Sequence, residues 1–206
     1  MDIIGFALAV LLIELTPGPN MAWLSGLAAT EGRRAGMAAV AGVALGLLVN
    51  GVLAALGLAT LLQMMPELLR GLQLAGAAMM VFLAIQAWRG SGRGAGSKAP
   101  SIPPEQVHRR SFVTGLLINL LNPKAYIFFV VVAPQFLRGA TLSLANALVL
   151  AVVSAVIATA IHVALVLAGA RAHDWLADPS RTVWARRGFA LVMLAVAASF
   201  VLADLG

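Results

Sequence analysis

Two charged side chains lie within long apolar stretches of this sequence. Glu14 directly follows the run ALAVLLI, and Lys124 lies inside LLINLLNPKAYIFFVVV. If these stretches cross a membrane, an ionised group at the bilayer centre costs at least about 2.5–3.5 kcal/mol, so it normally faces a cavity or an opposite charge. We expect both side chains to face one central cavity, where Lys124 attracts a carboxylate and Glu14 attracts an amine or a coupled proton. A static ion pair between them is the alternative.

Each of these charges is close to a motif that should break a helix. The segment TPGPN (Thr16–Asn20) follows Glu14, and the dipeptide Asn122-Pro123 precedes Lys124. Proline removes a helical hydrogen bond and clashes with the preceding turn, while glycine adds backbone freedom. Broken backbone at membrane depth is tolerated only where it is buried in protein or lines a watery cavity. We therefore expect two interruptions that face a shared binding site, with simple proline kinks as the alternative.

A broken helix can bind a ligand through its backbone. The half-helix that begins near Asn20 would present free N–H groups and the positive end of its dipole, which suit a carboxylate. The half that ends near Thr16 would present free carbonyl groups, which suit an ammonium group or another cation. A zwitterion matches both ends. The candidate substrate-binding residues are Glu14, Thr16, Pro17, Gly18, Pro19, Asn20, Asn50, Asn119, Asn122, Pro123 and Lys124.

Other polar residues in the apolar stretches carry weaker signals. Asn50, Asn119 and His162 could line the same path, although a lone intramembrane Asn or His is as often part of an interhelical hydrogen bond. Glu14 and His162 are the candidates for ion coupling. The two glycines of GVALG (Gly42–Gly46) would let helices approach closely. We favour packing within one subunit for these glycines, and the seam of a homodimer is the alternative.

The composition assigns these motifs to membrane-spanning helices. Hydrophobic residues make up 61% of the 206 residues and charged residues only 11%, whereas a typical soluble domain has about 25% charged residues. Because about 20 apolar residues cross a bilayer as a helix, the sequence predicts an all-α membrane protein with six transmembrane helices in one domain, residues 1–206. The first apolar run has no basic residue before it, so we expect it to remain as a span rather than act as a signal peptide. The predicted spans are Ile3–Ala29, Ala35–Met64, Leu68–Trp88, Phe112–Phe136, Leu142–Ala170 and Gly188–Ala203.

The spans divide into two similar halves. A polar segment at about 89–111, rich in Gly, Ser and Pro, is typical of a flexible linker and separates a first repeat at about 1–88 from a second at about 112–206. LIEL at Leu12–Leu15 matches LINL at Leu117–Leu120, and a proline motif follows each. Since each half has three spans, two similar halves must have opposite orientations in the membrane. We therefore predict inverted three-helix repeats, with helices one and four broken at their proline motifs.

The net charge is +6, and the distribution of the basic residues along the chain indicates the orientation of the protein in a membrane. Most basic residues follow the first, third and fifth predicted spans, and positive loops normally face the cytoplasm, so we expect both termini outside. A patch that binds RNA or lipid headgroups is the less favoured interpretation, and we expect the bilayer but no nucleic acid as a partner. The basic residues concerned are Arg33, Arg34, Arg89, Arg93, Lys98, Arg109, Arg110, Arg171, Arg181, Arg186 and Arg187.

Signatures of enzymes and of cofactor sites are missing from the sequence. It has no cysteine, which excludes disulfides and thiolate metal sites. It also has no H-E-x-x-H, no G-x-S-x-G and no P-loop motif. We expect no enzyme activity, no cofactor and no bound metal.

Four segments together resemble the LysE/RhtB amino-acid exporters over nearly the whole chain. They are TPGPN, ALGLATLL (Ala55–Leu62), AGAAMMVFLAIQAWR (Ala75–Arg89) and NLLNPKAYIFFVVVAPQF (Asn119–Phe136). The resemblance implies a bacterial inner-membrane transporter that exports amino acids by alternating access, driven by the proton motive force. His162 lies where related exporters often have an acidic residue.

The resemblance also bears on the substrate and on the residues that carry over. Exporters of basic amino acids would favour several carboxylates, and Glu14 is the only one within the predicted spans. A neutral amino acid such as homoserine, threonine or a branched-chain residue is therefore expected. A divalent metal-cation exporter of the same superfamily and a non-transporting structural protein are the alternatives. The residues that carry over are Pro17, Gly18, Pro19, Asn20, Asn122, Pro123 and Lys124.

Overall fold

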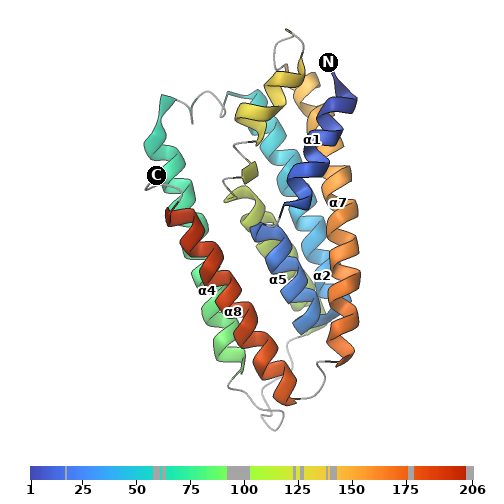
Figure 1. Ribbon diagram of the computed structural model, residues 1–206, viewed down its shortest axis with the longest axis vertical. Coiled ribbons are helices and arrows are strands. Elements are labelled where there is room, and N and C mark those ends of the chain that lie inside the picture. Colours follow the sequence, from blue (N-terminus) through green and yellow to red (C-terminus); the bar gives the residue numbers. More distant parts are fainter. Residues whose placement is uncertain are drawn as a thin grey trace.

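The computed structural model is helical throughout the residues that it describes, with no β-strand among them (Figure 1). It describes the whole chain except residues 17, 58–60, 62–63, 92–102, 123, 126–127, 138, 140–142, 176–178 and 203–206. A π-helical turn, η1 (Phe128–Val132), and a 3₁₀ turn, η2 (Ala133–Leu137), lie between α5 and α7. The α-helices are α1 (Ile3–Leu15), α2 (Pro19–Ala55), α4 (Pro66–Ser91), α5 (Pro104–Leu120), α7 (Leu144–Trp175) and α8 (Pro179–Leu202).

Helix α2 reverses direction at Gly32. This glycine has φ +84° and ψ 177°, a backbone conformation that glycine occupies far more readily than other residues. In a continuous helix, residues 28 and 36 would be about 12 Å apart along the axis. Here a Cβ built on Gly36 would lie only 3.3 Å from the Cβ of Ala28, so the chain folds back between them. Residues 19–31 therefore form a first arm that packs against a second arm, residues 33–55. The sequence predicted a polar loop around Arg33 and Arg34, whereas the reversal needs only the glycine.

Replacing Gly32 with alanine should destabilise the protein. A non-glycine residue in this region of φ and ψ costs about 1–3 kcal/mol, so the midpoint of thermal unfolding should fall by about 2–10 °C. Gly188→Ala is the matched control, because Gly188 lies in α8 and a Cβ there meets nothing within 4 Å. A Gly32→Ala variant as stable as Gly188→Ala would contradict the strain assigned to the turn. Scanning fluorimetry of the purified variants in detergent measures both.

Four described helices are long and apolar enough to cross a membrane, fewer than the six predicted spans. The difference follows from the interruptions. The first predicted span is divided between α1, which has only 13 residues, and the first arm of α2. The fourth is divided between α5 and the turns η1 and η2. The structure thus shows a multi-helix apolar protein and does not by itself give the number of crossings. The helices long enough to cross are Pro19–Ala55, Pro66–Arg89, Leu144–Ala172 and Arg181–Val201.

Several predicted boundaries differ from the structure; the last span, for example, was predicted to begin at Gly188, whereas α8 begins at Pro179. The second span was predicted to reach Met64, but α2 ends at Ala55 because Gly57, with φ +93°, terminates the helix. The linker predicted at about 89–111 is shorter at both ends, since α4 continues to Ser91 and α5 begins at Pro104. The middle of that linker, residues 92–102, lies outside the described residues.

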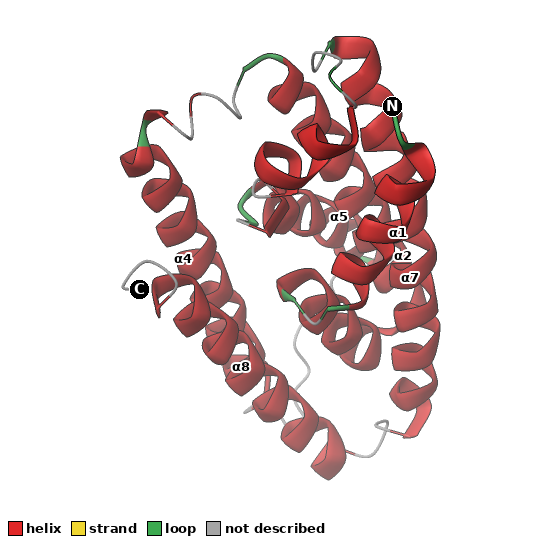
Figure 2. Ribbon diagram, turned by 45° about the horizontal axis from the view of Figure 1, so that its top comes forward, coloured by secondary structure: helices red, strands yellow, loops and turns green. Residues whose placement is uncertain are grey.

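The helices form a bundle of α1, α2, α5 and α7 beside a pair made by α4 and α8, which diverges from the bundle in Figure 2. Within the bundle, α2 and α5 cross with backbones almost in contact. A Cβ on Gly42 would lie 2.0 Å from the carbonyl oxygen of Phe112, and one on Gly115 would lie 2.4 Å from that of Ala39. The interpretation of the Gly42–Gly46 spacing as packing within one subunit is therefore confirmed.

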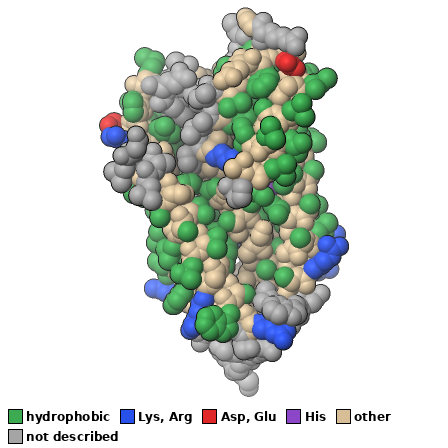
Figure 3. All heavy atoms as spheres, in the orientation of Figure 1, with side chains coloured by type: hydrophobic (Ala, Val, Ile, Leu, Met, Phe, Trp, Pro, Cys, Tyr) green, Lys and Arg blue, Asp and Glu red, His purple; other side chains and the backbone are tan. Residues whose placement is uncertain are grey.

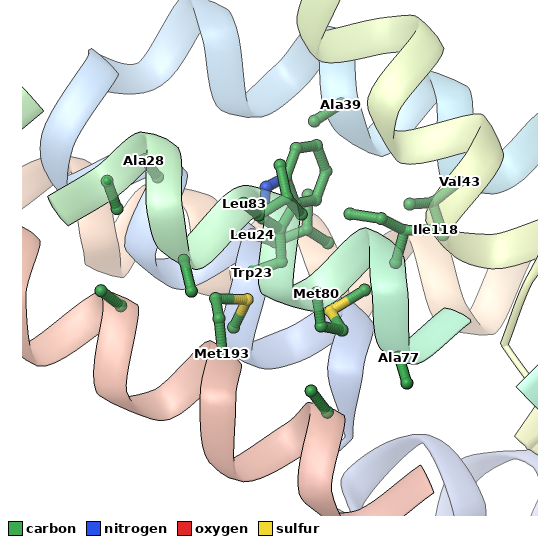
Figure 4. Close-up of a cluster of buried hydrophobic side chains, with 14 of the residues drawn as sticks. Trp23, Leu24, Ala28, Ala39, Val43, Ala77, Met80, Leu83, Ile118 and Met193 are labelled. Carbon is green, nitrogen blue, oxygen red and sulfur yellow. The ribbon is translucent and has the colours of Figure 1, made fainter. Parts of the chain in front are cut away.

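Two buried apolar clusters hold these parts together. The first joins the α4–α8 pair to α2 and α5 (Figure 4). The second joins α1, the end of α2, η1, η2 and α7, and includes Phe6, Val10 and Phe129. Prominent members of the first cluster are Trp23, Leu24, Ala28, Ala39, Val43, Ala77, Met80, Leu83, Ile118 and Met193.

Basic side chains gather at one end of the molecule, the lower end in Figure 3. The reversal of α2, the start of α5, the end of α7 and the start of α8 all meet there (Figure 1). On that end the guanidinium carbon of Arg187 lies 5.5 Å from the ring centre of Trp88 and 5.9 Å from that of Trp184. Tryptophan side chains are enriched at the membrane–water boundary, and an arginine over their rings adds a cation–π attraction.

Candidate functional site

The first predicted helix break is present. Helix α1 ends at Leu15, Thr16 is extended with ψ 123°, and α2 begins at Pro19 after Gly18, which is also extended. The hydroxyl of Thr16 donates a 3.0 Å hydrogen bond to the carbonyl of Leu12, which satisfies one of the end groups of α1. Pro17 lies outside the described residues. The residues on either side of it confirm that TPGPN interrupts the helix.

The second predicted break is also present. Helix α5 ends at Leu120, and the backbone N–H of Asn122 donates to the carbonyl of Asn119 at 3.2 Å. The side-chain oxygen of Asn122 then accepts a 3.0 Å hydrogen bond from the N–H of Lys124, as a helix-capping residue does. Pro123 lies outside the described residues. The chain therefore leaves one helix and starts another helical segment at the predicted motif.

Both breaks border one pocket. Its cavity volume is about 20 Å³, and since about 10–15 Å³ suffices for one water molecule, the pocket has room for little more than that. Glu14 and Lys124 both line it, as predicted. The lining residues are Val10, Ile13, Glu14, Asn20, Leu47, Asn119, Asn122, Lys124, Ala125, Phe128, Phe129 and Ser154.

Three buried asparagines meet at this pocket. The side-chain amide of Asn20 donates to the side-chain oxygen of Asn119 at 2.9 Å, and that of Asn50 donates to the backbone oxygen of Asn119 at 3.4 Å. Among the described residues, Asn20 Oδ1, Asn50 Oδ1 and Asn119 Nδ2 have no partner. A buried polar group without a partner costs about 1–3 kcal/mol. Asn20 and Asn119 line the pocket, so their two unpartnered atoms face the space that a ligand or water would enter, whereas Asn50 does not line it.

The ammonium group of Lys124 does not pair with Glu14. Its Nζ donates to the backbone oxygens of Ile13 and Thr16, the latter at 3.0 Å. The ion pairs between described residues do not include one between Glu14 and Lys124. The static ion pair considered from the sequence is therefore absent. The carbonyl groups near Thr16 were predicted to be free, and this was wrong, because two of them already accept hydrogen bonds from Lys124.

Glu14 instead lies beside His162. Its Oε2 is 3.5 Å from Nε2 of His162, and the side chain of His162 is 1% exposed. This contact is not a hydrogen bond, and His162 Nε2 has no hydrogen-bond partner among the described residues. His162 is not among the residues that line the pocket. It contacts Glu14 but not the pocket itself.

Four predicted residues that the structure describes, Thr16, Gly18, Pro19 and Asn50, do not line the pocket. Thr16, Gly18 and Pro19 form the edge of the first break, and only the backbone oxygen of Thr16 bonds to a lining side chain. Asn50 reaches the site through Asn119.

Sequence reasoning missed Ser154, which lines the pocket from α7. It is 3% exposed, and its hydroxyl has no partner among the described residues. A serine in an apolar helix usually bonds to a carbonyl of its own preceding turn, so its sequence context gave no signal. The aromatic wall of Phe128 and Phe129 was missed as well, because the π-helical turn that directs these rings has no recognisable pattern in the sequence.

The chain is similar to known membrane translocators. Residues 11–204 match the family described as LysE type translocator. The homoserine/homoserine lactone efflux protein of Salmonella typhimurium is 28% identical over 94% of this chain and 93% of its own length. An uncharacterized membrane protein of Pseudomonas aeruginosa is 34% identical over 84% of this chain and 82% of its own. The threonine efflux protein of Escherichia coli K12 is 32% identical over 60% of each chain. No solved structure matches the sequence significantly.

Proposed function

The chain belongs to the LysE type translocator family, and on that premise we propose that it exports a small, neutral amino acid or a close analogue from the bacterial cytoplasm. It is a multi-pass membrane protein of a translocator family rather than of an enzyme family. Relatives named for efflux of homoserine and of threonine support an exporter. The observation that carries the proposal is the pocket bordered by both helix breaks, which contains Glu14 and Lys124.

The charges of the pocket support a zwitterionic, neutral substrate. Glu14 offers one carboxylate for an amine, and Lys124 offers one ammonium group for a carboxylate. The asparagine amides and Ser154 add hydrogen-bonding groups that are uncharged. A basic amino acid would need a second carboxylate, and a divalent cation prefers six or more oxygen ligands, several of them from carboxylates. The lining offers neither.

The size of the pocket supports alternating access. A cavity of about 20 Å³ is too small for any amino acid, so transport requires the pocket to widen toward each side of the membrane in turn. One half of the chain supplies the break between α1 and α2, and the other half supplies the break after α5. In this proposal the two halves are inverted repeats of three spans, and both termini face outward.

We assign proton coupling to Glu14 and His162. Their side chains are 3.5 Å apart, and an ion pair forms between them only when the imidazole is protonated. A proton that enters from outside and binds the imidazole would thus give Glu14 a cationic partner that competes with the substrate amine. A homodimer stays a prediction from the sequence.

An efflux assay tests the proposed function. Bacteria that express the chain are loaded with dipeptides, and the free amino acids released into the medium are measured against a strain carrying the empty vector. We expect one or a few neutral amino acids to leave severalfold faster, and to leave more slowly when an uncoupler collapses the proton gradient. If no amino acid leaves faster at verified membrane abundance, the proposal fails. Unequal metal tolerance of the two strains would instead favour a cation exporter.

A further inference from the structure

The end of α1 holds a cation that comes from the other half of the chain. A helix ends with carbonyl groups that lack helical partners and carry the negative end of the dipole. Helix α1 has no basic residue in its own last turn. The positive charge is supplied by Lys124, whose Nζ bonds to the oxygens of Ile13 and Thr16 across a sequence separation of 111 and 108 residues.

We propose that these carbonyl groups form an ammonium-binding site, which Lys124 occupies when no substrate is bound and which the substrate ammonium takes over. Lys124 is then released and pairs with the substrate carboxylate in the same pocket, while the ammonium group bound by the two oxygens also faces the carboxylate of Glu14. This inference rests on the proposed function for the identity of the natural ligand. The site itself is defined by the two backbone oxygens, Ile13 O and Thr16 O.

The geometry allows such an exchange. An ammonium group is a compact point charge with three donors on a flexible stem, and Lys124 lines the pocket that also contains Glu14. The neighbouring wall is glycine: a Cβ on Gly18 would lie 3.7 Å from both Cδ and Nζ of Lys124, at ordinary contact distance. No tight side-chain packing from Gly18 therefore holds the lysine stem in place.

The energetics favour an exchange over an empty site. Two backbone oxygens left without partners in a low-dielectric setting would each cost about 1–3 kcal/mol. Replacing one ammonium group by another keeps both hydrogen-bonded and leaves their local charge unchanged. An amine that lacks a carboxylate also fits the two oxygens, but it brings no carboxylate of its own for Lys124, which is then left with Glu14 as the anion in the pocket. The exchange therefore favours zwitterions over simple amines.

Chemical complementation of a lysine deletion tests the site directly. In Lys124→Ala, the missing atoms correspond to n-propylammonium. We expect n-propylammonium chloride, at a concentration about 100-fold above its Kd, to raise the unfolding midpoint of purified Lys124→Ala by about 5 °C or more. Neutral n-propanol should have no such effect. In Lys124→Met the side chain fills the same space without a charge, so this matched variant should respond much less. An equal response of all variants and the wild type would overturn the proposal.

A second measurement uses the unaltered protein. The chain contains only two lysines, Lys98 in the linker and Lys124. A small acylating reagent is applied with and without n-propylammonium, in excess over that amine so that the amine does not deplete it. Mass spectrometry then gives the labelling of Lys124 relative to Lys98. We expect the relative labelling of Lys124 to rise severalfold, because the added amine displaces it from the carbonyl groups. Unchanged relative labelling would overturn the proposal even if Lys124→Ala does not fold.

These measurements separate the ammonium site from the transport function. Both use binding and labelling of purified protein, and neither depends on efflux. Complementation together with absent efflux would support the ammonium site and count against the exporter. Efflux without complementation and without a change in labelling would support the exporter and overturn the exchange.

Discussion

Replacing Glu14 with glutamine is expected to lower the efflux rate about 10- to 100-fold, because a hydrogen bond to a charged group contributes about 1.5–3 kcal/mol. Glutamine keeps the size and shape of the side chain but removes the charge that faces the pocket and His162. The loss should appear in the dipeptide-loading assay with variants matched for abundance in the membrane.

Glu31→Gln is the control for that experiment. Glu31 also lies beside a basic side chain, in a 3.1 Å ion pair with Arg186, but it is 39% exposed and lies at the basic end of the molecule. An exposed ion pair contributes about 0–1 kcal/mol, so this variant should export normally. Normal efflux by a stably folded Glu14→Gln variant would exclude Glu14 from substrate binding and from coupling.

Replacing Gly42 with valine is expected to abolish folding or to destabilise the protein by about 3 kcal/mol or more. The first added carbon would lie 2.0 Å from the carbonyl oxygen of Phe112 and 2.9 Å from the N–H nitrogen of Leu116. Both neighbours are backbone atoms of α5, so no side-chain rotation relieves the overlap, and the two helices must separate. The yield of monodisperse protein and its unfolding midpoint in detergent measure the effect.

Gly71 offers the contrasting position. It lies in α4, it is exposed, and a Cβ there meets nothing within 4 Å. Gly71→Ala should be neutral or stabilising by about 0.5–1 kcal/mol, because alanine has the higher helix propensity. Similar stabilities for Gly42→Val and Gly71→Ala would show that α2 and α5 do not pack as described.

Local chemistry made the main features of this fold predictable from sequence. Long apolar runs can satisfy their backbone in a membrane only as helices, and the described chain is helical. Proline cannot continue a helix, so the breaks after Leu15 and Leu120 followed from TPGPN and NPK. The shared pocket was predictable because two rare charges, Glu14 and Lys124, accompanied these breaks.

The features that were not predictable depend on contacts between distant segments. From the sequence we expected only carboxylate partners for Lys124, either the substrate or Glu14, and its bonds to backbone oxygens follow from the placement of the end of α1 beside it. The reversal at Gly32 was hidden because arginines next to it suggested a longer polar loop. Ser154 lines the same pocket as Asn119 because of the way α7 is oriented about its own axis. A uniformly apolar sequence does not reveal that orientation.

The close crossing of α2 and α5 also determines which parts of the molecule can travel. Interlocked side chains can change rotamer and let helices slide, but two backbones in contact, as at Gly42 and Gly115, hold α2 and α5 together as one rigid unit. We therefore expect the pocket to widen through movement of α1, of the irregular turns η1 and η2, and of the α4–α8 pair relative to that unit. The glycines thus separate a rigid core from the elements that move during transport.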